Sequence, residues 1–166
     1  MYLFCGKVKS LYALSPEEIN SVMIRGLYQN KIVLEEFNKR EKKICGISIH
    51  KLVQQIKEAN LDEISIILEY FVPGNMLRHD AVLVGYAHGI KLEIMVVELK
   101  ECESIKGSPA AQLHHYLRSL KCYHSEFQRN SPIIKLSSMS CIQNFEYRNR
   151  LFKFLHEIYK ANYMES

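Results

Sequence analysis

The chain has 166 residues, of which 48% are apolar and 24% charged, and its formal net charge is +4. These values are typical of one globular domain with a real core and exclude an intrinsically disordered chain. The charge permits a nucleic-acid partner without requiring one. The five cysteines include no C-x-x-C pair, which argues against a zinc ribbon or an iron–sulfur cluster. We expect a cytoplasmic protein with reduced thiols, no secretory signal and no membrane span.

The first sixty residues show helical patterns. Ser15 followed by Pro16 and Glu18 predicts a helix start, because Ser15 is a good N-cap and Glu18 can complete a capping box. A second helix is expected over residues 32–43. A third is expected to open at Ser48 and to end at residues 60–62.

From residue 64 the pattern changes to that of strands. The segments 64–72, 80–85 and 92–100 are rich in β-branched and aromatic residues, and the last two flank a predicted turn near His88 and Gly89. Pro109 then begins a predicted helix that runs to about residue 127. A fourth strand is expected over residues 132–136, and a closing helix follows over residues 147–163.

This order predicts a single α+β domain over residues 1–166, with a central mixed sheet of about four strands flanked by helices. Its parts would be a helical N-terminal region (1–60), a core (61–140) that holds the chemistry, and a closing helix within 145–163. The C-terminal part is then expected to contain a helix, a strand and a second helix, in that order.

Three charged residues lie in otherwise apolar strands: Asp80, Glu98 and Lys100. Because side chains alternate along a strand, Glu98 and Lys100 project from one face, and Asp80 shares a face with the valines that follow it. A turn centred near His88 places Asp80 opposite Glu98, or nearly so. A sheet covered on both faces does not accept such charges without compensation.

Two neighbouring carboxylates repel, and a divalent cation relieves that repulsion. Hard oxygen ligands favour Mg²⁺ or Mn²⁺. We expect Asp80 and Glu98 to hold the metal, helped by the Leu99 carbonyl, with Lys100 polarising a water or offsetting charge on a phosphodiester. The alternative is a structural Glu98–Lys100 pair at a strand end, with Asp80 as a turn residue.

The ordered set of motifs resembles the PD-(D/E)XK nuclease superfamily, whose core is helix, three strands, helix, strand. Asp80 matches its strand-two aspartate, Glu98-Leu-Lys100 its E-x-K, and Gln112-Leu-His-His-Tyr116 the Q-x-x-x-Y motif of RecB-like members. More narrowly, residues 60–127 resemble the nuclease-like N-terminal domain of P-loop DNA/RNA helicases related to the Schlafen group.

The resemblance implies an α/β/α restriction-endonuclease-like fold and Mg²⁺-dependent hydrolysis of DNA, less readily RNA, by metal-activated water. Gln112 and Tyr116 would support the site. Glu69 is a candidate for a further acid. Basic residues suited to nucleic-acid contact are Arg78, Lys106 and Arg118.

One departure from the helicase group is that no G-x-x-x-x-G-K-[ST] motif occurs, so a helicase or ATPase motor would be a separate partner or a fused domain. Two alternative functions stay open. One is a catalytically inactive nuclease fold that only binds nucleic acid, and the other is a protein-interaction or inhibitor domain. The sequence does not indicate an oligomeric state.

Overall fold

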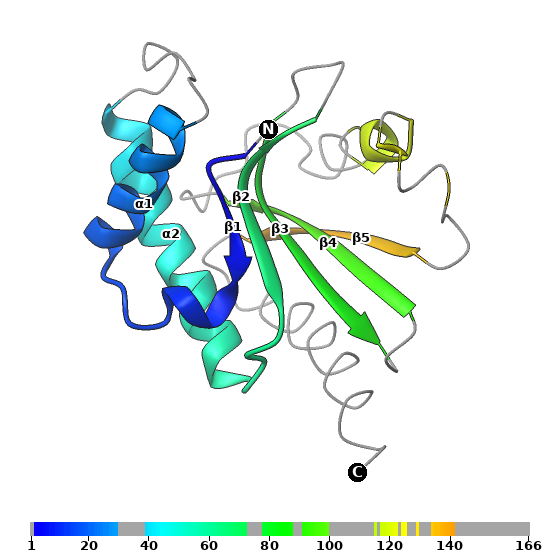
Figure 1. Cartoon of the computed structure of the whole chain (residues 1–166), viewed down its shortest axis with the longest axis horizontal. Helices are drawn as coiled ribbons and strands as arrows, with labels where there is room; N and C mark the ends of the chain where they lie inside the picture. The colour runs from blue at the N-terminus through cyan, green and yellow to red at the C-terminus, as the bar shows by residue number, and fades with distance from the viewer. Residues whose placement is uncertain are drawn as a thin grey trace.

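The computed structural model describes residues 2–29, 39–72, 78–87, 91–99 and 134–141, with His124 and the helical residues 115, 117–122, 125 and 129. In chain order its elements are β1 (Phe4–Lys7), the 3₁₀ helix η1 (Val8–Leu11), α1 (Pro16–Gln29), α2 (Lys39–Glu58), β2 (Ser65–Phe71), β3 (Arg78–Ala87), β4 (Lys91–Leu99) and β5 (Ile134–Cys141). This is the predicted α+β content (Figure 1). The expected closing helix lies outside the described residues. No described helix is long and apolar enough to cross a bilayer.

The strands form one mixed sheet in the order β1-β2-β3-β4-β5. Strands β1 to β4 pair antiparallel, whereas β5 pairs parallel with β4. A parallel pair needs a crossover connection, and the helical residues 117–122 belong to the segment that makes it. The mixed character agrees with the prediction. The sheet has five strands where about four were expected, because the sequence analysis missed β1.

Strand β1 lies inside the region that was expected to be helical throughout. Its residues alternate between partly buried and exposed, as befits a short edge strand, so no apolar run marks it. Its partner is distant in sequence, since Phe4 lies opposite Leu68. A second difference concerns α2, which passes through Ser48 without a break, so the prediction of a helix start there was wrong.

The start of α1 is the capping box that the sequence predicted. The Glu18 backbone N–H donates to the Ser15 hydroxyl at 3.2 Å, and the Ser15 backbone N–H donates to the Glu18 carboxylate at 2.7 Å. These two bonds satisfy amide groups that have no partner within the helix. The cap therefore fixes where α1 begins.

Ser15→Ala is expected to lower the free energy of unfolding by about 1 kcal/mol, because it removes one of the two capping bonds. Urea denaturation measures this difference. Ser21→Ala is the control, since Ser21 is exposed within α1 and its hydroxyl bonds to the Glu17 carbonyl of the same helix. Equal losses in the two variants would contradict a capping role for Ser15.

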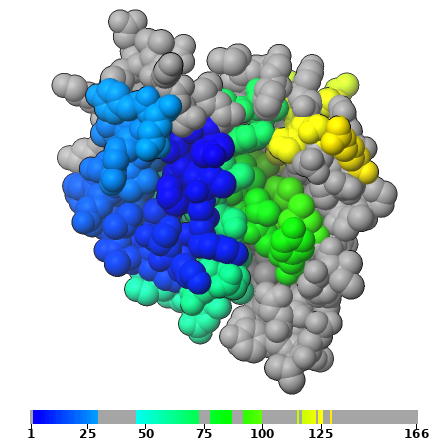
Figure 2. All heavy atoms as spheres, in the orientation of Figure 1, coloured from blue at the N-terminus to red at the C-terminus, as the bar shows by residue number. Residues whose placement is uncertain are grey.

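The sheet is covered differently on its two faces. One face packs against α1 and α2 in a helix-side core, whose sheet residues include Ile66, Leu68, Ala81, Leu83, Met95 and Val97. The other carries an opposite-face cluster, formed by Val72, Val82, Ile94, Val96 and Leu120 with Ile67, Tyr70, Val84, Leu92 and Leu117 packed against it. Leu117 and Leu120 come from the helical residues 117–122. In Figure 2 these residues are yellow, and the green strands separate them from the blue N-terminal part of the chain. The described residues thus form three layers.

Candidate functional site

Asp80 and Glu98 lie on the same face of the sheet. Val82 of β3 and Val96 of β4 both belong to the opposite-face cluster. Alternation along β4 places Glu98 on the face of Val96, and alternation back from Val82 gives Asp80 the same face. The alternation of β3 breaks next to Asp80, because His79 stacks on Tyr70 and so also lies on that face. Both acids therefore point away from the layer formed by α1 and α2.

The register of the hairpin also brings these acids together. Ala81 lies opposite Val97 in the β3–β4 pair. One further step along both strands, beyond the paired residues, would place Asp80 opposite Glu98, and facing Cα atoms of a regular antiparallel pair are about 4.5–5.5 Å apart. The register centres on residue 89, one residue later than the predicted centre at His88. The ladder itself ends at Ala81 and Val97, so the pairing of the two acids stays a prediction that this register supports.

The Asp80 carboxylate is anchored to the neighbouring strand. Its Oδ2 accepts a hydrogen bond of 2.7 Å from the backbone N–H of Leu99. The Asp80 side chain is half-buried, whereas Glu98 is only 4% exposed. A nearly buried carboxylate beside a second one is electrostatically costly, since both charges lose solvation and repel each other. The pair therefore favours a positive charge close by.

Glu69 of β2 lies in the same transverse row as these acids. The backbone pairs on either side of it join Leu68 to Ala81 and Tyr70 to His79, so Glu69 lies across from Asp80 without forming a regular ladder pair. Its φ is 51°, a left-handed value that is rare in a strand. Beyond it, Tyr70 packs on the opposite-face cluster although Leu68 packs in the helix-side core. The regular alternation of side chains along β2 is therefore interrupted at Glu69.

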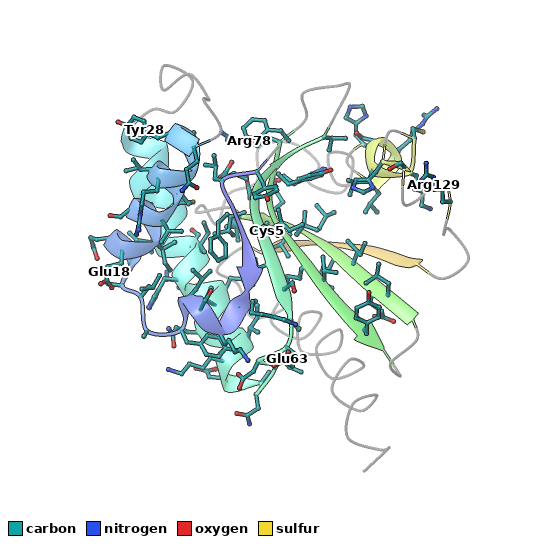
Figure 3. The ribbon with its side chains drawn as sticks, viewed as in Figure 1. Cys5, Glu18, Tyr28, Glu63, Arg78 and Arg129 are labelled. Atoms are coloured by element: carbon teal, nitrogen blue, oxygen red, sulfur yellow. The ribbon has the colours of Figure 1, made fainter. Side chains whose placement is uncertain are left out.

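An arginine compensates the charge of Glu69. The Nε of Arg78 lies 3.0 Å from Oε2 of Glu69, whose side chain is fully buried, while the Arg78 side chain is 34% exposed. Arg78 opens β3, two residues before Asp80, and Figure 3 labels it at that end of the strand. Sequence reasoning named both residues separately but missed their contact, because the pairing depends on the β2–β3 register.

A ring stack adjoins the acids. The Tyr70 ring lies 6.2 Å from that of His79, nearly parallel at 17°, and 6.2 Å from that of His124, tilted by 50°. His79 is fully buried. Burial lowers the pKa of His79 from 6.5 to about 4, so this imidazole is neutral at neutral pH. It therefore adds no positive charge beside Asp80 under those conditions.

Protonation of His79 is expected to destabilise the fold in acid. The unfolded chain takes up this proton near pH 6.5 and the folded chain only near pH 4, so stability is full above 6.5 and falls between these values. The loss attributable to His79 is at most about 3 kcal/mol. Urea denaturation at about pH 7 and about pH 4.5 measures it.

His79→Gln should flatten this dependence, whereas His115→Gln, at an exposed helical position, should leave it unchanged. For each variant, the free energy of unfolding at about pH 4.5 is subtracted from that at about pH 7. A loss of stability that is equal at both pH values therefore does not affect the comparison. An unchanged slope in His79→Gln would contradict the assignment.

The donor set at Asp80 and Glu98 fits a hard divalent cation. Two carboxylates from adjacent strands supply oxygen ligands, and backbone carbonyl oxygen or water commonly completes such a shell. Within the part of the chain that the structure describes, no three or more His, Cys, Asp or Glu side chains gather into a metal site. The predicted set therefore consists of two acids, with the Leu99 carbonyl as the proposed third donor.

Several predicted site residues cannot be placed relative to this pair. Lys100, Lys106, Gln112 and Tyr116 lie outside the described residues. Arg118 belongs to the helical residues 117–122 and is exposed. The described part of the site thus comprises the two acids, the buried Glu69–Arg78 pair and the ring stack.

Comparisons of the chain with protein-family models, curated proteins and solved structures find no match. The functional argument therefore rests on the chemistry and geometry of the residues themselves.

Proposed function

We propose that the chain adopts a PD-(D/E)XK-like, restriction-endonuclease-like fold. The order of elements supports this assignment: a helix (α2), three antiparallel strands (β2, β3 and β4), helical residues 117–122, and a fifth strand parallel to β4. Helical residues on both faces of the sheet fit the same architecture. The order matches the superfamily core that the motifs resemble.

On this fold we propose a metal-dependent nuclease that hydrolyses phosphodiester bonds of DNA. One inference from the strands carries the proposal: alternation from Val82 and Val96, with the register continued one step beyond Ala81 and Val97, brings Asp80 and Glu98 side by side on adjacent strands. Apolar neighbours in the opposite-face cluster keep the local dielectric low, so the carboxylates interact strongly with a cation. Mg²⁺ or Mn²⁺ suits this donor set.

Each residue has a distinct part in this proposal. Asp80 and Glu98 would hold the cation, and the Leu99 N–H keeps the Asp80 carboxylate in place. When bound, the metal would lower the pKa of a water and so supply the nucleophile at neutral pH. Lys100 would orient that water or offset charge on the phosphate. Gln112 and Tyr116 would support the substrate.

Incubation of the purified chain with plasmid, single-stranded DNA and RNA tests this function. We expect cleavage with Mg²⁺ or Mn²⁺ and none with EDTA, and DNA to be the better substrate. Loss of cleavage in Lys100→Ala would assign the activity to this site and not to a contaminant. A preparation that shifts DNA in a gel but cuts none of these substrates would contradict catalysis and favour the inactive binding module. Failure both to bind and to cut, with no metal-dependent thermal shift, would favour a protein-interaction domain.

A further inference from the structure

The sheet divides into two branches at the end that carries the proposed metal ligands. Strand β3 stays paired with β2 up to its first residue, and β4 stays paired with β5 up to its last residue. The ladder between β3 and β4, however, ends at Ala81 and Val97. The described ends of these two strands therefore form a fork, whose branches are residues 78–80 of β3 and 98–99 of β4.

The fork begins where β3 is irregular. The register of β2 and β3 passes over Glu69 and Asp80 without pairing them, and Glu69 has the left-handed φ of 51°. On the other side of Asp80, His79 departs from the alternation of β3 because its ring stacks on that of Tyr70. Irregular residues of this kind bend a strand away from its regular course. The bend accounts for the end of the β3–β4 ladder in this row.

One side chain bridges the fork. A regular ladder would continue with Leu99 opposite His79. The Leu99 N–H instead donates to Oδ2 of Asp80, at 2.7 Å. A hydrogen bond from an N–H to a carboxylate is charge-assisted and stronger than one to a backbone carbonyl. The Asp80 carboxylate thus takes the place of a ladder partner and holds the two branches together.

The proposed cation would join the same two branches. Its ligands come from different strands, since Asp80 belongs to β3 and Glu98 to β4. Glu98 is only 4% exposed, so a cation that it shares with Asp80 would interact with it in a poorly solvated place, where charges act strongly. Binding of the cation therefore favours a closed fork over an open one.

We propose that Asp80 is the latch of this fork: its Oδ2 holds Leu99 of the other branch without metal, and a divalent cation shared with Glu98 tightens the closure. The second part rests on the proposed function. Loading of the metal is then also a conformational step, because it orders the backbone at Leu99, whose carbonyl is the proposed third donor.

Amide hydrogen exchange of the whole chain, resolved for single residues by NMR, tests the latch first in EDTA. We expect the Leu99 amide to exchange at least about tenfold faster in Asp80→Ala, because its charged acceptor is lost. Asp80→Asn should exchange more slowly than Asp80→Ala, since the amide oxygen can still accept the bond. Asp62→Ala is the control, because Asp62 is exposed and lies before β2.

The Met95 amide serves as the internal reference, since Met95 pairs with Leu83 inside the β3–β4 ladder. A variant that lowers only the global stability speeds exchange at both amides, so the ratio of the Leu99 rate to the Met95 rate isolates the fork. The control should leave this ratio unchanged.

Mg²⁺ is then added, with its Kd measured by calorimetry. At about ten times the Kd, a cation that binds only the closed fork should slow Leu99 exchange about tenfold relative to Met95 in the unaltered protein. Asp80→Asn at the same Mg²⁺ concentration should show no such slowing, because it lacks the charge that attracts the cation.

The proposal is overturned if Asp80→Ala and the unaltered protein have the same exchange ratio in EDTA. It is also overturned if Mg²⁺ binds to the unaltered protein and leaves that ratio unchanged. Failure of the proposed function has a different signature. A chain that takes up no Mg²⁺ and cuts no DNA, yet loses protection at Leu99 in Asp80→Ala, would refute the nuclease and the tightening and leave Asp80 as a structural latch alone.

Discussion

Asp80→Asn is expected to lower metal-dependent DNA cleavage at least about 100-fold while leaving the fold intact. The amide oxygen of asparagine can still accept the hydrogen bond from the Leu99 N–H, so the tie between β3 and β4 is kept. What is lost is the negative charge that attracts the cation. Substitutions that only support a metal ligand cost about 10–100-fold, so removal of a ligand charge should cost at least as much.

Cleavage rates at saturating Mn²⁺, with circular dichroism and urea denaturation as tests of folding, measure this effect. Asp62→Asn is the matched control, because Asp62 is exposed and precedes β2, at the opposite end of that strand from Glu69. We expect the control to cleave like the unaltered protein. A fully active Asp80→Asn would remove Asp80 from the site.

Gly26→Ala is expected to destabilise the fold strongly, on the order of 2–3 kcal/mol. A Cβ atom at residue 26 would overlap the backbone carbonyl oxygen of Leu3 and would lie 2.6 Å from the carbonyl carbon of Leu3. In an ordinary helix interior the same substitution stabilises by about 1 kcal/mol, so close packing reverses the sign. The glycine lets α1 approach the segment that leads into β1.

Thermal unfolding should show this loss as a fall in Tm of roughly 5–10 °C for a chain of this size. Ser21→Ala, at an exposed position of α1, should show no comparable fall. A second substitution, Leu3→Ala, should not rescue Gly26→Ala, because the obstructing atoms belong to the backbone. A stable Gly26→Ala variant would show that α1 packs less closely against Leu3 than the structure has it.

Local sequence signals were sufficient for several features of the fold. The capping box at Ser15 and Glu18 depends on residues three positions apart, so it could be predicted without knowledge of the tertiary structure. The β3–β4 hairpin could be predicted for a similar reason, since a short connection sets the register of β3 against β4. Both features depend only on neighbours in the chain.

Features that depend on distant contacts were missed. Strand β1 pairs with β2 across the whole helical region, and its four residues carry no strand pattern of their own. The left-handed backbone at Glu69 and its contact with Arg78 arise from the β2–β3 register. The bond from the Leu99 N–H to Asp80 likewise requires the strands in place. Sequence reasoning therefore identified candidate residues more readily than their partners.

The most direct test of the proposed nuclease site is a crystal structure of the chain soaked in Mn²⁺, with the ion located by its anomalous scattering. The account predicts a peak between the carboxylates of Asp80 and Glu98, with Glu69 still bonded to Arg78, and loss of that peak in Asp80→Asn. Well-ordered carboxylates with no peak between them, or a peak bound by other residues, would contradict it.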